Sequence, residues 1–436
     1  RDFYALKDQN QMETEYEHGP LEPAYTFSRN GKNVLVIMLD RAISGYVPYI
    51  FEEKPELLED FSGFTYYPNC ISFGAHTTFG ALAIFGGYEY TPLEIQKRHT
   101  ERLAKKHDEA TLVLPKIFAG NSFDTTVSDQ PFTDPALCDS FQEINRVSVI
   151  RRYTARYLAT NDKLELFDYS SLLKKNLIHF SLFVFTPLTF REDIYDDGDY
   201  LSSPQEYELP KSMVDNYAAL EYLPDITKIT DDDAAYCSIM VNNLTHEPAF
   251  LPVPDYTPVE YAGSGGGGLF SNEDSYHVNI AAYLLLAKWF RFLKSNNVWD
   301  NTRIIIVSDH GANLHSPFPD NITLPNGDDL EFYQALLLVK DFNSAGTSGN
   351  MLNTDNEFMT NADVPFLAVR ALIQNPVNPF TGKPVTTEKR NGVFITTSHL
   401  WELNKHGKNK FNIKDDQWLY VHDNIFDPGN WERTEK

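Results

Sequence analysis

Cysteine is scarce in this chain. Its 436 residues include only Cys70, Cys138 and Cys237, which lie far apart and show no C-x-x-C spacing. At most one disulfide can form, and neither a zinc knuckle nor a redox-active cysteine pair is indicated. The cysteines alone leave the compartment of the protein open.

Long hydrophobic runs are also missing. No stretch reaches the roughly 18 to 20 uncharged apolar residues that a membrane-spanning helix needs. The nearest run, residues 176–190, is rich in phenylalanine but contains His179 and Pro187. We expect it to belong to the core, and the alternative is that part of it rests on a membrane surface. Because the chain begins with Arg1 and not Met, we expect a membrane anchor in a preceding segment of the native protein.

Positive charge is in deficit. The chain has 37 Lys and Arg against 61 Asp and Glu, a net charge of −24. Such a balance argues against DNA or another nucleic acid as the main partner, although a local metal ion could still bind an anionic group. The 42% of apolar residues is ample for the core of a globular protein.

Two apolar runs end in metal-ligand types. Residues 33–39 (NVLVIML) lead into Asp40, and residues 304–307 (IIIV) lead through Ser308 into Asp309 and His310. Runs of this kind are typical of strands buried on both faces of a parallel sheet. Open α/β sheets keep their chemistry at the carboxyl ends of such strands, so we expect one metal site built from both ends of the chain.

The remaining pattern fits the same fold class. Further strands are predicted at 122–129, 234–241 and 335–340, and helices at 110–118 and 276–294. We predict an α/β fold: a doubly wound, mostly parallel sheet flanked by helices, with a small C-terminal α+β subdomain.

The predicted domain organisation has one main domain. Residues 1–30 form a polar lead-in segment or linker, 31–375 the main domain and 376–436 the C-terminal subdomain. Within the main domain, the irregular stretch 158–225 is a candidate substrate-facing insertion. The glycine-rich stretch 263–268 has no phosphate-loop lysine after it, so we interpret it as a linker or mobile flap.

Asp40, Asp309 and His310 are the ligand types of a divalent metal with an open coordination position. Such a metal lowers the pKa of a bound hydroxyl and stabilises charge on a transferring group. Neighbouring strand residues point to opposite faces, but Gly311 permits the bend that lets Asp309 and His310 converge.

The nucleophile candidates are two threonines. His76, Thr77 and Thr78 stand at the start of a small-residue helix that ends at Gly86-Gly87. The threonines could be ordinary N-caps. Alternatively, the helix dipole and a metal activate one hydroxyl as a nucleophile. His246, in a polar turn after a predicted strand, suits protonation of a leaving group or donation to a phosphoryl oxygen.

These pieces, in this order, resemble the alkaline phosphatase and sulfatase superfamily, and more narrowly its bacterial lipoteichoic-acid synthase and phosphoethanolamine transferase branch. The resemblance rests on NVLVIMLD ending at Asp40, TTFGALAIFGG from Thr77, NNLTHEP around His246 and SDHG at 308–311. It covers residues 32–370 and identifies the main domain as a sulfatase-like catalytic domain.

The resemblance implies roles for these residues. Asp40, Thr77, Asp309 and His310 would hold a zinc or manganese ion. Thr77, with Thr78 as the alternative, would carry the covalent phospho-substituent during turnover. His246 would lie near the transferred phosphate.

The chain departs from the family pattern in several places. The first metal ligand is often Glu and is Asp40 here, followed by Arg41, which could contact a substrate anion. His315 is the near candidate for a further substrate or metal contact, and Glu247 is a substrate-side candidate beside His246. Because no Cys-x-Pro-x-Arg motif occurs around Thr77, formylglycine sulfatase chemistry is not expected.

The implied function is a metal-dependent transferase outside the cytoplasm. It would move a phosphoglycerol or phosphoethanolamine group from a phospholipid donor to a hydroxyl of a glycan or lipid. There are two alternatives. One is a phosphodiesterase, phosphatase or sulfatase-like hydrolase that acts on a soluble ester, and the other is a non-catalytic surface binding domain. The head group, the acceptor, the metal and the oligomeric state stay open.

Other polar residues have weaker assignments. We expect His99 and His107, in a charged helical stretch, to be surface residues. His399 lies in the C-terminal region, where a substrate role is conceivable. Asp363 is interpreted as a helix cap.

Overall fold

The computed structural model describes most of the chain. The described residues are 21–131, 144–161, 164, 181–187, 190–191, 209–259, 270–314, 318, 321–344, 352–387, 392–399 and 406–434. Among the predicted features, His315, Cys138 and the glycine stretch 263–268 lie outside these residues, as do parts of the stretches 176–190 and 158–225.

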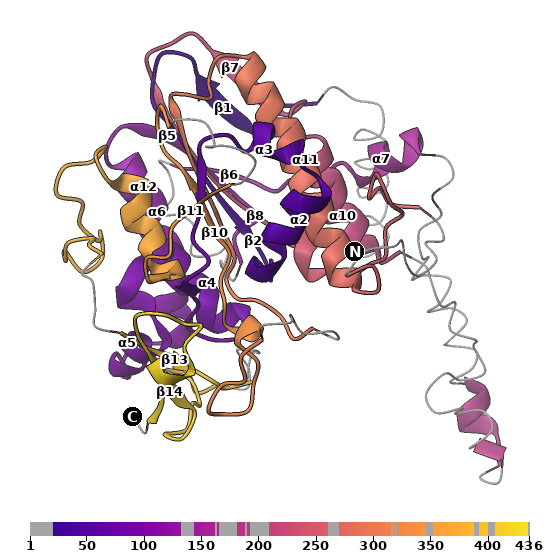
Figure 1. Cartoon of the computed structure of the whole chain (residues 1–436), viewed down its shortest axis with the longest axis vertical. Helices are drawn as coiled ribbons and strands as arrows, with labels where there is room; N and C mark the ends of the chain where they lie inside the picture. The colour runs from indigo at the N-terminus through magenta and orange to yellow at the C-terminus, as the bar shows by residue number, and fades with distance from the viewer. Residues whose placement is uncertain are drawn as a thin grey trace.

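An eight-stranded mixed sheet forms the centre of the molecule (Figure 1). Its spatial order is β11 (Asn353–Thr354), β3 (Phe64–Tyr66), β10 (Leu337–Lys340), β9 (Thr302–Val307), β2 (Asn33–Leu39), β8 (Ala235–Asn242), β5 (Phe123–Ser128) and β6 (Ile144–Val147). Strand β10 runs antiparallel to both neighbours, and every other adjacent pair is parallel. The expected mostly parallel sheet is confirmed.

The two strands that carry the metal-ligand candidates are neighbours. Strand β2 pairs in parallel with β9, with Met38 opposite Val307, and all residues of both strands are buried. Because the strands run in the same direction and in this register, Asp40 and Asp309 leave the sheet at the same edge.

Helices cover both faces of the sheet (Figure 1). One face holds α2 (Val47–Glu53), α3 (Leu57–Asp60), α7 (Thr154–Thr160), α10 (Lys211–Glu221) and α11 (Asp274–Ser295). The other holds α4 (Thr77–Gly86), α5 (Pro92–Lys97), α6 (Leu103–Ala119) and α12 (Val364–Val369). Alternate residues of β2 serve the two cores: Leu35 and Ile37 pack on the first layer, and Val34 and Val36 on the second.

Smaller elements complete the fold. The C-terminal antiparallel sheet consists of β13 (Val393–Thr396), β14 (Trp418–Val421) and β15 (Trp431–Thr434). Two-stranded pairs are β1 (Tyr25–Ser28) with β7 (Thr227–Thr230), and β4 (Cys70–Ile71) with β12 (Met359–Thr360). Short 3-10 helices are η1 (Ser44–Tyr46), η2 (Gly87–Tyr90), η6 (Leu244–His246), η7 (Leu330–Phe332), η8 (Asn361–Asp363) and η10 (Pro428–Asn430). The predicted fold class is thereby confirmed, while the predicted domain boundaries stay predictions.

Two observations concern the weaker assignments. His107 lies inside α6 with 1% of its surface exposed, so the prediction that it is a surface residue is wrong, whereas His99 is exposed. The charged residues around His107 concealed that its own position faces the layer between α6 and the C-terminal region, where its ring contacts Phe411. Asp363 is the third residue of η8 and completes a capping box with the N-cap residue Thr360, whereas at the N-cap of α12 its side chain makes no cap hydrogen bond. Within the described residues, no helix is both long and apolar enough to cross a membrane.

Candidate active site

Asp40 is held by its backbone at the end of β2. Its amide donates to the carbonyl of Asn242 at 3.0 Å, and Thr245 Oγ1 donates to its carbonyl oxygen at 2.6 Å. The residue is 7% exposed, and its Oδ1 has no hydrogen-bond partner among the described residues. The main chain is therefore fixed while one side-chain acceptor stays unsatisfied.

Asp309 is fully buried, and two hydrogen-bond donors fix it. The Arg41 amide donates to its Oδ1 at 2.9 Å, and the Asn361 side chain donates to its carbonyl oxygen at 3.1 Å and to that of Gly80 at 3.2 Å. A Cβ at Gly80 would lie 2.0 Å from the Asp309 carbonyl oxygen. Glycine therefore allows α4 to approach the turn that carries Asp309.

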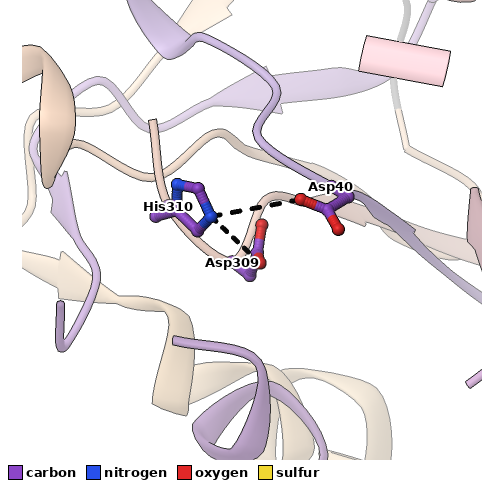
Figure 2. A group of neighbouring side chains, drawn as sticks. All are labelled: Asp40, Asp309 and His310. Atoms are coloured by element: carbon purple, nitrogen blue, oxygen red, sulfur yellow. Dashed lines mark ion pairs between the residues drawn. The ribbon is translucent and has the colours of Figure 1, made fainter. Parts of the chain in front are cut away.

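The tautomer of His310 follows from its hydrogen bond. Its Nδ1 lies 2.6 Å from the carbonyl oxygen of Gly311, which can only accept, so Nδ1 carries the proton. In the neutral ring the lone pair is then on Nε2. This atom faces Asp309 Oδ2 at 3.5 Å and Asp40 Oδ1 at 4.0 Å (Figure 2).

The three side chains could hold a metal ion. One ligand atom from each lies within 4.8 Å of the others, and all three residues are buried. Asp40 Oδ1 and Asp309 Oδ2 lack hydrogen-bond partners in the described part of the chain, and a cation between two such acceptors would satisfy both. Two carboxylates and one imidazole suit zinc or manganese, so the residues present fit the metal that the motifs imply.

The electrostatics of Asp40 point the same way. Burial raises the pKa of Asp40 well above its ordinary value, and the negative charge of Asp309 raises it further, while Arg41 opposes the change. Keeping both carboxylates ionised in this place is therefore unfavourable without a positive charge. A divalent cation supplies that charge.

Thr77 stands beside this group. It is the first residue of α4, and its Oγ1 lies 3.5 Å from His310 Nε2. His76 occupies the N-cap position, so the structure does not place either threonine there. Thr77 is partly exposed, whereas Thr78 is 1% exposed. The geometry therefore favours Thr77 over Thr78 as the group that a substrate can reach.

A cavity of about 630 Å³ opens over these residues. Its described wall includes Asp40, Arg41, Ala75, His76, Thr77, Thr78, Pro131, Asn243, His246, Glu247, His310, Gly311, Ala312 and Phe332. The structure thus brings together the predicted site residues that it describes, from four separate segments of the chain.

The substrate-side candidates line the rim. Arg41 has a φ of 61°, a left-handed backbone conformation that is rare outside glycine and often marks functional sites. His246 is exposed at the rim, and its pKa is lowered by partial loss of water and by the nearby Arg41 guanidinium. Glu247 Oε2 accepts a hydrogen bond from Ser212 Oγ at 2.9 Å, which orients its carboxylate.

The sequence reasoning assigned no role to His76 or Asn361. The His76 ring centre lies 6.2 Å from that of His310 and 5.9 Å from that of His399. Burial, followed by the two neighbouring histidines, lowers the pKa of His76 to about 4, so this ring is neutral near pH 7. The position of His76 directly before Thr77 was a usable signal, but nothing in the sequence pointed to Asn361.

Comparisons with known proteins give structural likeness alone. No protein-family model matches the sequence, and no curated protein matches it. The lipoteichoic acid synthase LtaP from Listeria monocytogenes is 10% identical, with a TM-score of 0.42, over 91% of this chain and 86% of that one. A protein of the alkaline phosphatase superfamily from Vibrio parahaemolyticus is 12% identical, with a TM-score of 0.43, over 98% and 91%.

A third similar structure was determined with zinc. The C-terminal periplasmic domain of EptC from Escherichia coli, in complex with Zn, is 12% identical, with a TM-score of 0.40, over 78% of this chain and 82% of that one. The chain is similar in fold to these solved structures, and the family resemblance of its motifs stays a prediction.

Proposed function

We propose that this protein is a metal-dependent enzyme that transfers a phospho-substituent through a covalent intermediate on Thr77. One observation carries the proposal: Thr77 Oγ1 lies 3.5 Å from His310 Nε2, at the edge of the buried group formed by His310, Asp40 and Asp309. A hydroxyl is a weak nucleophile, and a position beside a metal is one of the few ways to activate it.

The first half of the reaction loads Thr77. Asp40, Asp309 and His310 would hold a zinc or manganese ion, which when bound lowers the pKa of the Thr77 hydroxyl and neutralises charge on the phosphoryl group. The Thr77 proton leaves to water in the open cavity. The Thr77 oxygen forms a bond to phosphorus, the bond from phosphorus to the donor alcohol breaks, and the alkoxide takes a proton from water.

Three features of the chain support this step. The amino end of the ten-residue helix α4 favours negative charge at Thr77. The Arg41 guanidinium at the rim can pair with phosphoryl oxygens. The lowered pKa of His246 favours its neutral ring, whose single N–H can donate to a phosphoryl oxygen.

The second half unloads Thr77. A hydroxyl of the acceptor attacks phosphorus and loses its proton to water, and the bond to the Thr77 oxygen breaks and restores the threonine. Because Thr77 is partly exposed, water can reach the same phosphorus, and hydrolysis is the second candidate function. A non-catalytic surface domain is the weaker alternative, because drift without selection would remove some of these residues.

The finer substrate assignment follows from the motif resemblance. We propose a phosphoglycerol or phosphoethanolamine group, a phospholipid donor, and a glycan or lipid hydroxyl as acceptor. Such a reaction belongs outside the cytoplasm, on a protein anchored to the membrane through a segment outside this chain. Nucleic acid is not a proposed partner.

Adduct mapping on the purified chain tests the proposal. The zinc- or manganese-loaded protein is incubated with vesicles of phosphatidylglycerol or phosphatidylethanolamine, and its intact mass and peptides are then measured. We expect one phospho-substituent on Thr77, no adduct in Thr77→Ala, and an unchanged adduct in the matched control Thr78→Ser. An adduct on Thr78, or equal phosphodiesterase activity of wild type and Thr77→Ala, would overturn it.

A further inference from the structure

A short apolar piece of the chain projects into solvent. Residues 181–185 are helical, and Figure 1 shows this piece in magenta at the lower right, away from the sheet and its flanking helices. Its exposed large side chains, with their exposed fractions, are Leu182 (49%), Val184 (61%), Phe185 (87%) and Phe190 (58%). The expectation that the run 176–190 belongs to the core is therefore wrong for its described part. We call the described residues between 181 and 191 the apolar tip.

The apolar side chains surround the helical piece. Successive residues of a helix are rotated by about 100°, so the four consecutive apolar residues 182–185 point in all directions around the axis. A groove on a partner protein covers one side of a short helix and would leave the other side chains in water. The hydrocarbon of a bilayer accepts apolar side chains from every direction, so it covers this distribution better.

The tip also pairs its own backbone carbonyls. The Leu182 carbonyl accepts hydrogen bonds from the Thr186 amide at 2.9 Å and from Thr186 Oγ1 at 2.6 Å. The Arg191 guanidinium donates to the carbonyls of Val184 and Thr186, both at 3.0 Å. Unpaired carbonyls are costly in hydrocarbon, because no water is there to donate to them. A helical piece with these carbonyls paired is therefore suited to an apolar medium.

The charges next to the tip fit a phospholipid surface. Residues 169–191 contain two lysines and Arg191 but no Asp or Glu, although the whole chain carries a net charge of −24. The Arg191 guanidinium lies over the Phe183 ring, with its central carbon 5.4 Å from the ring centre. Cations beside an apolar segment can pair with lipid phosphates while the apolar part is buried. Five acidic residues follow within 192–199, and their need for water limits insertion to the tip.

We propose that the apolar tip inserts into the surface of a phospholipid bilayer, with Val184 and Phe185 among the acyl chains and Arg191 at the level of the phosphates. The run 176–190 is shorter than the roughly 20 residues that cross a bilayer, so the tip enters one leaflet and does not span it. The proposal rests on exposed side chains and holds whether or not Thr77 is a nucleophile.

Flotation with vesicles tests the partner on the full chain. The protein is kept in EDTA so that no turnover occurs, and it is mixed with phosphatidylcholine vesicles. We expect binding both at about 0.15 M and at about 1 M salt, because salt screens attraction between charges but does not weaken apolar insertion. Binding that requires phosphatidylglycerol in the vesicles and disappears at high salt would show attraction between charges alone, and would overturn insertion.

A double variant tests the location. Val184→Ser with Phe185→Ser removes two exposed apolar side chains of the tip, and the matched control, Val377→Ser with Phe380→Ser, removes an exposed valine and phenylalanine elsewhere. We expect the first pair to lower the vesicle partition coefficient by roughly tenfold or more, and the control to keep the wild-type value. Because all four side chains are exposed, the fold should survive both changes. Wild-type partition in the first pair, or an equal loss in the control, would exclude the tip.

A tryptophan in the tip measures its depth. We expect the fluorescence that Phe185→Trp adds to that of the wild type to be quenched by phosphatidylcholine brominated on its acyl chains. The fluorescence that Phe380→Trp adds should be unaffected by the same vesicles. Equal quenching at the two positions, or none at position 185, would contradict insertion of the tip.

Other partners give different results. A wild-type protein that leaves vesicles unbound would overturn the proposal, and a dimer that Val184→Ser with Phe185→Ser dissociates would then assign the tip to a second copy of the chain. Vesicle binding without an adduct on Thr77 would overturn the proposed function and leave this inference intact. A Thr77 adduct from lipid dispersed in detergent, without vesicle binding, would do the reverse.

Discussion

The two ends of strand β9 differ in how their buried polar and charged groups are paired. At its start, Arg303 is 1% exposed and makes two hydrogen bonds to Asp341 Oδ1, at 2.7 and 3.0 Å. It also donates to the carbonyls of Ala368 and Arg370. Just past its end, Asp309 and His310 are also buried, but there Asp309 Oδ2 and the nearby Asp40 Oδ1 have no hydrogen-bond partner among the described residues.

Strand β10, which lies next to β9, also has a buried cation that donates to groups of the chain itself. Lys340, at the end of the antiparallel β10, has no exposed surface and donates to the carbonyls of Trp299, Thr302 and Asp341 at 2.7, 2.9 and 3.2 Å. Charges at this edge of the sheet are therefore neutralised or solvated by the chain itself. We infer that this edge is structural, and that the opposite edge is built to take a cation from outside.

The largest expected effect comes from neutralising a proposed metal ligand at the sheet edge that carries Asp40, Asp309 and His310, here called the cation edge. We predict that Asp309→Asn loses the bound divalent metal and on the order of 10³-fold in turnover, since a metal supplies several kcal/mol of transition-state stabilisation. The metal-free variant should be no less stable than metal-free wild type, because the substitution removes one of two facing carboxylates. Elemental analysis, phosphodiester turnover and urea unfolding in EDTA measure these quantities. Wild-type metal content in the variant would contradict the assignment.

At the opposite edge of the sheet, which carries Arg303 and Lys340, we expect a substitution to lower stability and to leave activity unchanged. We predict that Arg303→Met lowers the free energy of unfolding by about 3 kcal/mol, because it leaves the Ala368 and Arg370 carbonyls without this donor and removes one of the two guanidinium groups that pair with Asp341. Turnover per folded molecule and metal content should stay at wild-type values. Urea unfolding combined with active-site titration checks both. A loss of metal in this variant, at temperatures where it is folded, would break the contrast between the two edges.

The smallest expected effect is a pH dependence at the same edge. Burial lowers the pKa of Lys340 to about 8, whereas the unfolded chain has the ordinary value near 10.5. Between pH 8 and 10.5 the unfolded chain keeps the Lys340 proton, whereas the folded chain loses it. The free energy of unfolding therefore rises with pH across this window. Below pH 8 the folded protein bears the full cost of burying the charged Lys340. We expect the slope of unfolding free energy against pH in this window to be smaller in Lys340→Met than in wild type. Equal slopes would show that Lys340 is charged in both states.

Much of the cation edge could be predicted from the sequence. The runs before Asp40 and Asp309 contain six and four consecutive apolar residues, and such runs have few alternatives to a buried parallel strand. Two strands of this kind bring their carboxyl ends together, which places both acids at one edge. The prediction that both acids lie at one edge did not depend on the structure of the turns that follow the two strands.

Other parts could not be predicted because they depend on packing between distant segments. His107 lies in a charged stretch, yet it is buried together with its neighbours Lys106, Asp108 and Glu109. Asn361 donates to the carbonyls of Gly80 and Asp309, groups that every residue has and that no sequence pattern marks. The ring of His399 reaches His76 through the placement of the C-terminal region.

By itself, the sequence determined the fold class, the strands that end in acids and the threonine pair at a helix start, because apolar periodicity and residue type are local properties. Only the tertiary structure decided that Thr77 and not Thr78 faces His310, and that Asp40 Oδ1 and Asp309 Oδ2 lie near one another without a hydrogen-bond partner among the described residues. Distances between side chains on separate elements are set by how the layers pack, and no local pattern encodes them.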